Sequence, residues 1–271
     1  MDQYSAPALN VGDDIIEDIL ILHTENGRDH FISISGTWKP SIFGCNLISL
    51  LHINGQGIRN IGVKRLRDIH FGTFDTSEMV NVQPTNLDLV DWQEVGGKQS
   101  GRLSIPHELW RIVDFIFRYG MDLQDLWSGS SGSHEWVEYI QDCLETVTPF
   151  DLEKMLKDPE EEAIFEEDNS MHTSEINSEI LQSPQARGRE VSVRSMVDVL
   201  KRFLGSLAEP VVPFSSLASC LNEGCNNLTV AQECVQSFPP VHRNVFLYII
   251  SFLKETGGGE KIGRYFEQIF F

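Results

Sequence analysis

The spacing of the apolar residues changes its period near residue 105, and this change limits the fold more than any other feature of the 271-residue chain. Before that point the apolar residues gather in two short runs, Ile15–Leu22 and His30–Ser35, which are typical of β-strands. After it they recur at the spacing of an α-helix, as in Leu109, Trp110, Val113, Ile116 and Phe117. The sequence therefore predicts an α+β chain in which a β segment is followed by an all-α segment.

The two strand-like runs are separated by Glu25-Asn26-Gly27-Arg28. Asn-Gly between two apolar runs favours a hairpin, because both residues tolerate a positive φ. A single hairpin is only marginally stable in water. We therefore expect the two strands to pair, and either to join further strands or to dock on the segment that follows.

The stretch between the β and α segments is rich in Gly, Asn, Asp and Gln. This composition predicts a linker over residues 53–103, with one short strand or helix at 58–74. From Pro106, which suits the first turn of a helix, the helical period takes over. Further helices are predicted at 133–145, 193–207, 213–222, 230–237 and 241–255.

Acidic residues outnumber basic ones by 40 to 21, which gives a formal net charge of −19. A chain of this charge repels phosphate backbones and anionic lipid, so we expect no nucleic acid partner and no direct adhesion to a membrane. Seven of the acids fall in Asp158–Asp168, and a Ser-rich polar stretch follows them. Such a segment cannot bury enough apolar surface to order itself, which predicts a disordered insertion over about 157–190.

The five cysteines are odd in number and scattered, which is typical of free thiols in the cytosol. Neither they nor the dispersed histidines form a metal motif, and the sequence has no phosphate-binding loop or nucleophile motif. The first ten residues lack the pattern of a secretory signal, and the apolar runs are too short to cross a bilayer. We therefore expect a cytoplasmic protein without a metal or a cofactor.

Motifs in both segments resemble one family, the OCRL-type inositol polyphosphate 5-phosphatases. The motifs similar to the end of the family's ASH domain are Ile16–His23, Gly27–Phe31 and Ser35–Gly44. The motifs similar to its RhoGAP-like domain are Ile105–Trp110, Val113-Asp114, Gln124–Trp127, Asp142–Leu144, Leu200–Leu204 and Pro239–Leu253. The motifs follow the same order as in the family, which makes chance resemblance an inadequate explanation.

The resemblance implies a fold and a division of the chain. It implies a partial immunoglobulin-like (ASH) β segment in residues 1–52 and an all-α RhoGAP-like bundle in residues 104–256, which contains the acidic insertion. The linker 53–103 lies between them, and residues 257–271 form an unmatched tail. The family's N-terminal 5-phosphatase domain has no counterpart in this sequence.

The resemblance also implies partners. Members of the family act in signal transduction and in endosomal and Golgi membrane trafficking. They bind small GTPases of the Rho and Rab families, and their RhoGAP-like domain docks short helical peptides that carry a Phe-His motif. Association with endosomal and Golgi membranes is therefore expected to be peripheral and to run through partners.

Catalysis by a RhoGAP depends on an arginine finger, which is worth about 10³–10⁵ in the rate of GTP hydrolysis. By the resemblance the finger belongs in the stretch Gln124–Ser130, where Ser128 offers no charge, and no arginine lies between Arg118 and Arg187. Lys201 matches the helix lysine that contacts the GTPase in active members; the alternative is a solvated helix residue. The sequence thus predicts a protein that is not an enzyme, with Lys201 and Ser128 as candidate GTPase contacts.

Three aromatic residues are candidates for partner binding. Trp110 and Phe117 lie seven residues apart on one face of a predicted helix. Packing in the core is the default interpretation for them, and anchoring a helical peptide is the alternative. Phe43 lies at the junction of the two domains by the resemblance, either as a structural plug or as part of the peptide site.

These observations favour a non-catalytic RhoGAP-like interaction module that comes from a phosphoinositide 5-phosphatase. Two alternatives remain open at this point. The first is an active Rho GTPase-activating protein with a substitute for the finger. The second is a remnant without a function of its own.

Overall fold

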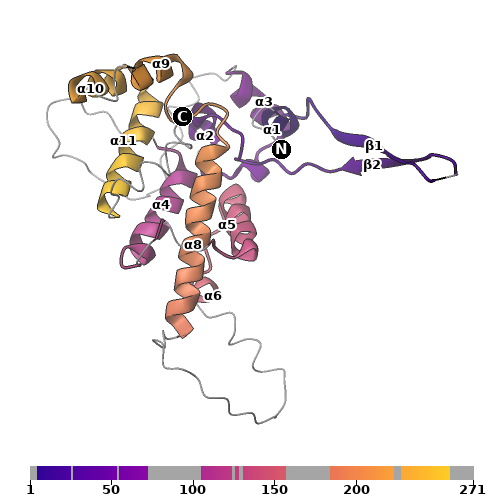
Figure 1. The fold of residues 1–271 in the computed structure, drawn as a ribbon, viewed down its shortest axis with the longest axis horizontal. Helices are drawn as coiled ribbons and strands as arrows, with labels where there is room; N and C mark the ends of the chain where they lie inside the picture. The colour runs from indigo at the N-terminus through magenta and orange to yellow at the C-terminus, as the bar shows by residue number, and fades with distance from the viewer. Residues whose placement is uncertain are drawn as a thin grey trace, which may run out of the picture.

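The computed structural model describes residues 5–25, 27–53, 55–72, 105–123, 126–127, 131–156, 184–222 and 227–256. Within these ranges a two-stranded sheet near the N-terminus is followed by a body of helices (Figure 1). The predicted α+β class is therefore confirmed.

The hairpin has the strands that the sequence predicts. Strand β1 (Ile16–Leu22) pairs antiparallel with β2 (His30–Gly36), in a register that sets Ile16 opposite Gly36 and Leu22 opposite His30. Residues 23–29 connect the strands, and Asn26 of the expected turn lies outside the described residues.

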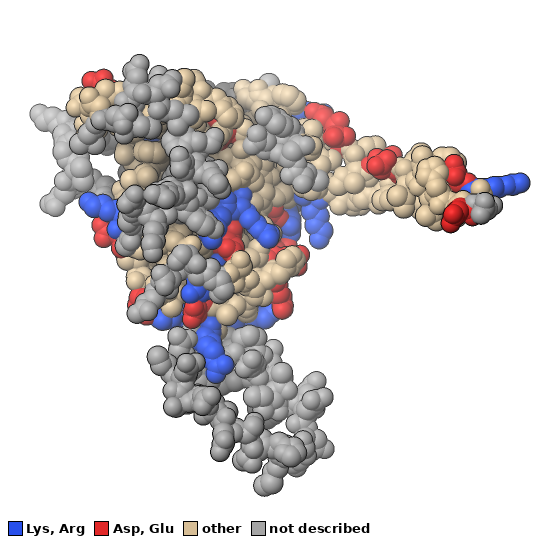
Figure 2. Space-filling model, in the orientation of Figure 1, with Lys and Arg blue, Asp and Glu red and all other residues tan. Residues whose placement is uncertain are grey.

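The hairpin projects from the helical body as an arm (Figure 1). All residues of β2 are exposed, and in β1 all but the half-buried Ile16 are exposed. Because side chains alternate along a strand, apolar residues cover both faces of the arm. One face carries Leu20, Leu22, Ile32 and Ile34, and the other carries Ile19, Ile21 and Phe31. Figure 2 shows the arm mostly in the colour of uncharged residues, with acidic groups at intervals along it and a basic group near its tip. Within the described residues the hairpin does not dock on the following segment, which leaves pairing with further strands as the open alternative.

Helix α8 (Pro184–Gly205) runs through the centre of the helical body (Figure 1). Helices α4 (His107–Gly120), α5 (His134–Thr146) and the short α6 (Leu152–Met155) pack against it. The side chains of α8 that fill the core are Val193, Met196, Val197, Val199, Leu200, Phe203 and Leu204.

Three more helices complete the described body: α9 (Phe214–Asn222), α10 (Leu228–Ser237) and α11 (Pro240–Glu255). Each agrees with a predicted helix. Helix α8, in contrast, begins at Pro184, nine residues before the predicted start. The assignment of 184–190 to a disordered insertion is therefore wrong, and residues 157–183 lie outside the described residues.

The short strand or helix predicted at 58–74 is helical, but the assignment of 55–72 to a linker is wrong, because this stretch folds onto the helical body. It forms the 3-10 helix η1 (Ile58–Asn60) and α3 (Val63–Phe71), which join α1 (Ser5–Asn10) and α2 (Leu47–Ile53). The buried residues of this part are Val11, Ile42, Leu47, Leu50, Ile53, Ile58, Ile61, Leu66 and Ile69, and they belong to the same core cluster as those of α8. The boundary predicted at residues 52 and 53 therefore cuts through one packed unit.

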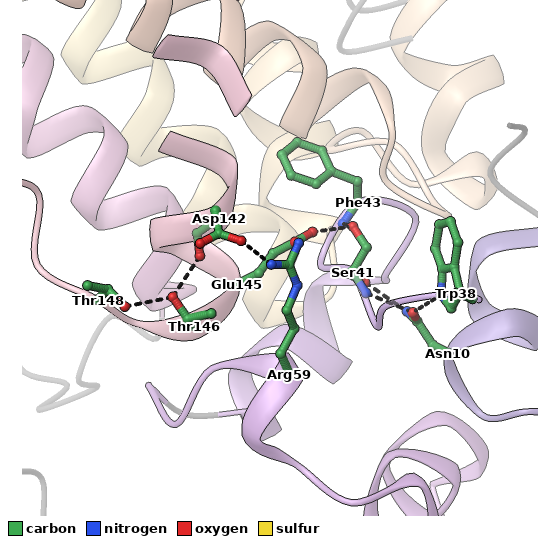
Figure 3. A network of polar contacts seen from close by, with 9 residues as sticks. All are labelled: Asn10, Trp38, Ser41, Phe43, Arg59, Asp142, Glu145, Thr146 and Thr148. Carbon is green, nitrogen blue, oxygen red and sulfur yellow. Dashed lines mark hydrogen bonds and ion pairs between the residues drawn. The ribbon is translucent and has the colours of Figure 1, made fainter. Parts of the chain in front are cut away.

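A polar network fastens this N-terminal part to α5 (Figure 3). The Arg59 guanidinium pairs with Asp142 and with Glu145, and Ser41 also donates to Glu145. Gly57 lies so close to the end of α5 that an added Cβ would stand 2.8 Å from the Glu145 carbonyl oxygen. Burial raises the pKa of Glu145, while Ser41 and Arg59 favour its ionised form. The ion pair with Arg59 thus stabilises the ionised carboxylate of Glu145, which is largely buried.

A second buried carboxyl group has no such partner. Glu108, in the first turn of α4, is fully buried, and neither of its carboxylate oxygens has a hydrogen-bond partner among the described residues. Burial raises the pKa of Glu108 to about 7. An ionised carboxylate in this place is destabilising, because the Glu108 backbone N–H and the Arg111 guanidinium compensate only in part for its lost hydration.

The pH dependence of the Glu108→Gln variant tests this description. The folded-state pKa lies above the unfolded value of 4.5, so this group's unfavourable contribution grows as pH rises from about 4.5 through about 7. The gain in unfolding free energy from Glu108→Gln should therefore be larger at pH 8 than at pH 5, by about 2 kcal/mol. Urea unfolding at the two pH values measures it. The exposed Glu153→Gln in α6 is the control and should show no such difference; an equal effect of Glu108→Gln at both pH values would contradict the expectation.

Candidate partner-binding faces

Helix α4 presents an outward stripe formed by Trp110, Asp114 and Phe117. The helix starts after Pro106, whose own backbone is not helical. Its other side is buried in the core through Leu109, Ile112, Val113, Phe115 and Ile116. Phe117 is 50% exposed, and Trp110 is half-buried and outside the buried core cluster. The stripe is thus an aromatic surface on a rigid element.

Groups around the stripe give it polar edges. The His107 ring stacks on Trp110 with 6.2 Å between ring centroids, and burial lowers the pKa of His107, which favours the neutral imidazole. Asp114 accepts a hydrogen bond from Nε of Arg118 at 2.9 Å. Burial and then the Asp114 carboxylate raise the pKa of Tyr248 on α11. Such a surface can take the apolar face of a helix and satisfy a few polar groups at its rim.

Phe43 makes a different contact. It lies in the loop between β2 and α2, is half-buried, and meets Phe203 of α8 edge to face with 6.2 Å between centroids. In the neighbouring Cys45, burial and then the Glu108 carboxylate raise the pKa of the thiol to about 12, so this loop approaches α4 from the Glu108 side. Two residues along an α-helix correspond to a rotation of about 200°, so Trp110 lies on nearly the opposite side of α4 from Glu108. Within the described residues no ring contact joins Phe43 to Trp110.

Lys201 lies on α8, with its Nζ 3.3 Å from Oδ1 of Asp198. Its side chain is only 22% exposed, so the interpretation as a freely solvated residue does not fit. Ser128 lies outside the described residues. The chain is described again from Ser131, where the Gly132 N–H donates to Oδ2 of Asp198 at 2.8 Å. Asp198 was not predicted from the sequence; an acid three residues before a lysine on a helix was the available signal.

Other kinds of site are not evident in the part of the chain that the structure describes. The best-formed cavity there measures about 40 Å³ and lies between α1, α2 and α3, with Asn10, Cys45 and His70 in its lining. This is room for about one water molecule. Within the same ranges, no group of three or more His, Cys, Asp or Glu is placed to hold a metal ion. None of the described helices combines the length and the apolar character that a membrane span needs.

Comparison with known proteins finds two family matches in this chain. Residues 1–38 match the ASH domain of OCRL-like inositol polyphosphate 5-phosphatases, and residues 152–258 match the RhoGAP domain. The α4 stripe lies between the two matched segments, on a helix that packs against α8 of the RhoGAP segment.

One relative spans almost the whole chain. The type II inositol 1,4,5-trisphosphate 5-phosphatase of Mus musculus is 27% identical over 255 residues, which is 94% of this chain. The chain spans 20% of the length of that protein. The chain thus carries one segment that matches the ASH domain of OCRL-like inositol polyphosphate 5-phosphatases and one that matches the RhoGAP domain, and it is similar over most of its length to a type II inositol 1,4,5-trisphosphate 5-phosphatase.

Proposed function

We propose that this chain is a non-catalytic RhoGAP-like module that binds small GTPases of the Rho and Rab families and short helical peptides. One observation supports the proposal most directly: the RhoGAP body with Lys201 is present, whereas no arginine lies between Arg118 and Arg187. That interval contains the whole stretch in which an arginine finger belongs by the resemblance. Without a cation beside the transferred phosphoryl group, such a module can bind a GTPase without accelerating hydrolysis.

The peptide-binding part of the proposal rests on the α4 stripe. A short peptide must recover the free energy of its own ordering from a few well-buried anchors. Trp110 and Phe117 offer such anchors, about two helical turns apart, which is the repeat of an amphipathic helix. Phe43 packs on Phe203 away from this stripe, so we assign it a supporting role at the domain junction.

The relative's name supports a wider context for the module. That protein is an inositol 1,4,5-trisphosphate 5-phosphatase, and this chain covers a fifth of it. We propose that the module serves a phosphoinositide 5-phosphatase of this kind, in signal transduction and in trafficking at endosomal and Golgi membranes. It reaches those membranes from the cytoplasm through its protein partners.

A single-turnover GTPase assay tests the absence of catalysis. Rho-family GTPases loaded with GTP should hydrolyse it at their intrinsic rate when the chain is added, because no finger stabilises the transition state. A stimulation above about tenfold would support an active GTPase-activating protein instead. Binding measured in parallel is the control that the complex forms. Cooperative thermal unfolding of the chain, which we expect from its single core, distinguishes a folded module from a remnant without function.

Two substitutions on the α4 stripe test peptide docking. Trp110→Ala should weaken the binding of a Phe-His helical peptide by about 2 kcal/mol, or roughly thirtyfold, because it removes a buried anchor. Phe117→Ala should weaken binding by several-fold. The ring of Phe117 is 50% exposed, so its loss affects the core little. Titration calorimetry measures the affinities.

The matched control is Phe214→Ala on α9, where the ring is 53% exposed. It should leave the affinity for the peptide unchanged. Each variant is first shown to melt like the parent, since loss of a core aromatic costs about 3–5 kcal/mol of stability by itself. Unchanged peptide affinity in a folded Phe117→Ala or Trp110→Ala protein, or no binding by the parent, would refute the docking site.

A further inference from the structure

Asp198 connects two parts of the chain that are far apart in sequence. Its Oδ2 accepts a hydrogen bond from the Gly132 N–H at 2.8 Å, and its Oδ1 lies 3.3 Å from Nζ of Lys201. The carboxylate is 21% exposed, so it lies at the edge of the body and is partly shielded from water. One side chain thus fixes both a loop before α5 and a lysine on α8.

The loop that Asp198 holds is pressed closely onto α8. An added Cβ at Gly132 would stand 2.3 Å from the Ser195 backbone, a distance that real Cβ atoms do not adopt. The next amide, Ser133 N–H, donates to Oγ of the fully buried Ser195 at 3.0 Å. Two consecutive backbone amides therefore anchor the loop 131–133 to consecutive turns of α8.

An ordinary ion pair on a helix surface would not need this arrangement. Glu190 and Arg194, two turns earlier on α8, form an ion pair at 2.6 Å with side chains that are 27% and 12% exposed, and within the described residues no hydrogen bond joins the Glu190 carboxylate to another segment. Gly132 lies close against α8, and the Asp198 carboxylate contacts both the loop and Lys201. These contacts hold the loop and Lys201 at fixed positions relative to each other.

We propose that Asp198 is a positioning residue, which holds the loop 131–133 and Lys201 as one rigid surface for a small GTPase. The proposal rests on the proposed GTPase binding and deepens it. Lys201 by itself would be a flexible side chain, and ordering it on binding would lower the affinity. Paired with Asp198, its ammonium group is oriented before the partner arrives.

Three variants of the full chain separate the parts of this arrangement. Asp198→Ala removes both contacts, Asp198→Asn retains an oxygen for the Gly132 amide but weakens the pairing with Lys201, and Gly132→Ala displaces the loop. Each should weaken, by about tenfold or more, the binding of a Rho- or Rab-family GTPase loaded with a non-hydrolysable GTP analogue, because a charge-assisted contact or its geometry is lost. Glu190→Ala breaks the matched ion pair on α8 and should leave the affinity unchanged.

Hydrogen exchange of the loop amides gives a second readout that needs no partner. Asp198→Ala should accelerate exchange at Gly132 and Ser133, whereas Asp198→Asn and Lys201→Ala should not. In a double variant, Asp198→Asn should add no more than about twofold to the loss caused by Lys201→Ala, because it acts through that lysine.

The outcomes separate the role of Asp198 from the proposed GTPase binding on which it rests. A parent chain that binds none of the tested GTPases overturns the proposed GTPase binding, and with it the role of Asp198 as its positioning residue. A parent that binds, with Asp198→Ala and Asp198→Asn of unchanged affinity, overturns only the role of Asp198. Tighter binding by Asp198→Asn would also overturn it, because Asp198 would then withhold Lys201 from the partner.

Discussion

The burial of α8 is the constraint on which the rest of the structure depends. Its apolar side chains are almost completely shielded, and so are its small polar ones: Ser192 donates to the Met155 carbonyl oxygen, and Ser195 donates to that of Val191. A helix that is apolar around much of its circumference needs neighbours on several sides. Helices α4, α5 and α6 supply them, and the N-terminal segment extends the same core.

This packing explains why the two candidate faces are separate. Helix α4 turns its apolar side to α8, so Trp110 and Phe117 face outward. The loop 131–133 meets α8 at its edge, near Lys201. A helical peptide on the first face and a GTPase on the second would use different residues, and both faces would be held rigid by the same central helix.

Periodicity predicted the elements that have a strong apolar pattern of their own. The hairpin and helices such as α4 and α11 are of this kind, and the family motifs identified the RhoGAP-like body. A short element was predicted at 58–74, but its packing into the body was missed because Gly55, Gly57 and Gly62 suggest a linker, whereas α3 packs on α1 and α2. The partners of Asp198 could not be predicted either, because the bond from Gly132 spans 66 positions of sequence.

The arm has a consequence for how the chain can change. Helix α1 before it and residues 41–72 after it pack into the same body, and Asn10 ties its two ends together by accepting from Trp38 Nε1 and from Ser41 N, each at 2.8 Å. The hairpin therefore leaves the body and returns to it at one place, like an insert between two neighbouring anchor points. Evolution can lengthen, shorten or exchange the arm as an independent part, while the contacts that hold the helices stay the same.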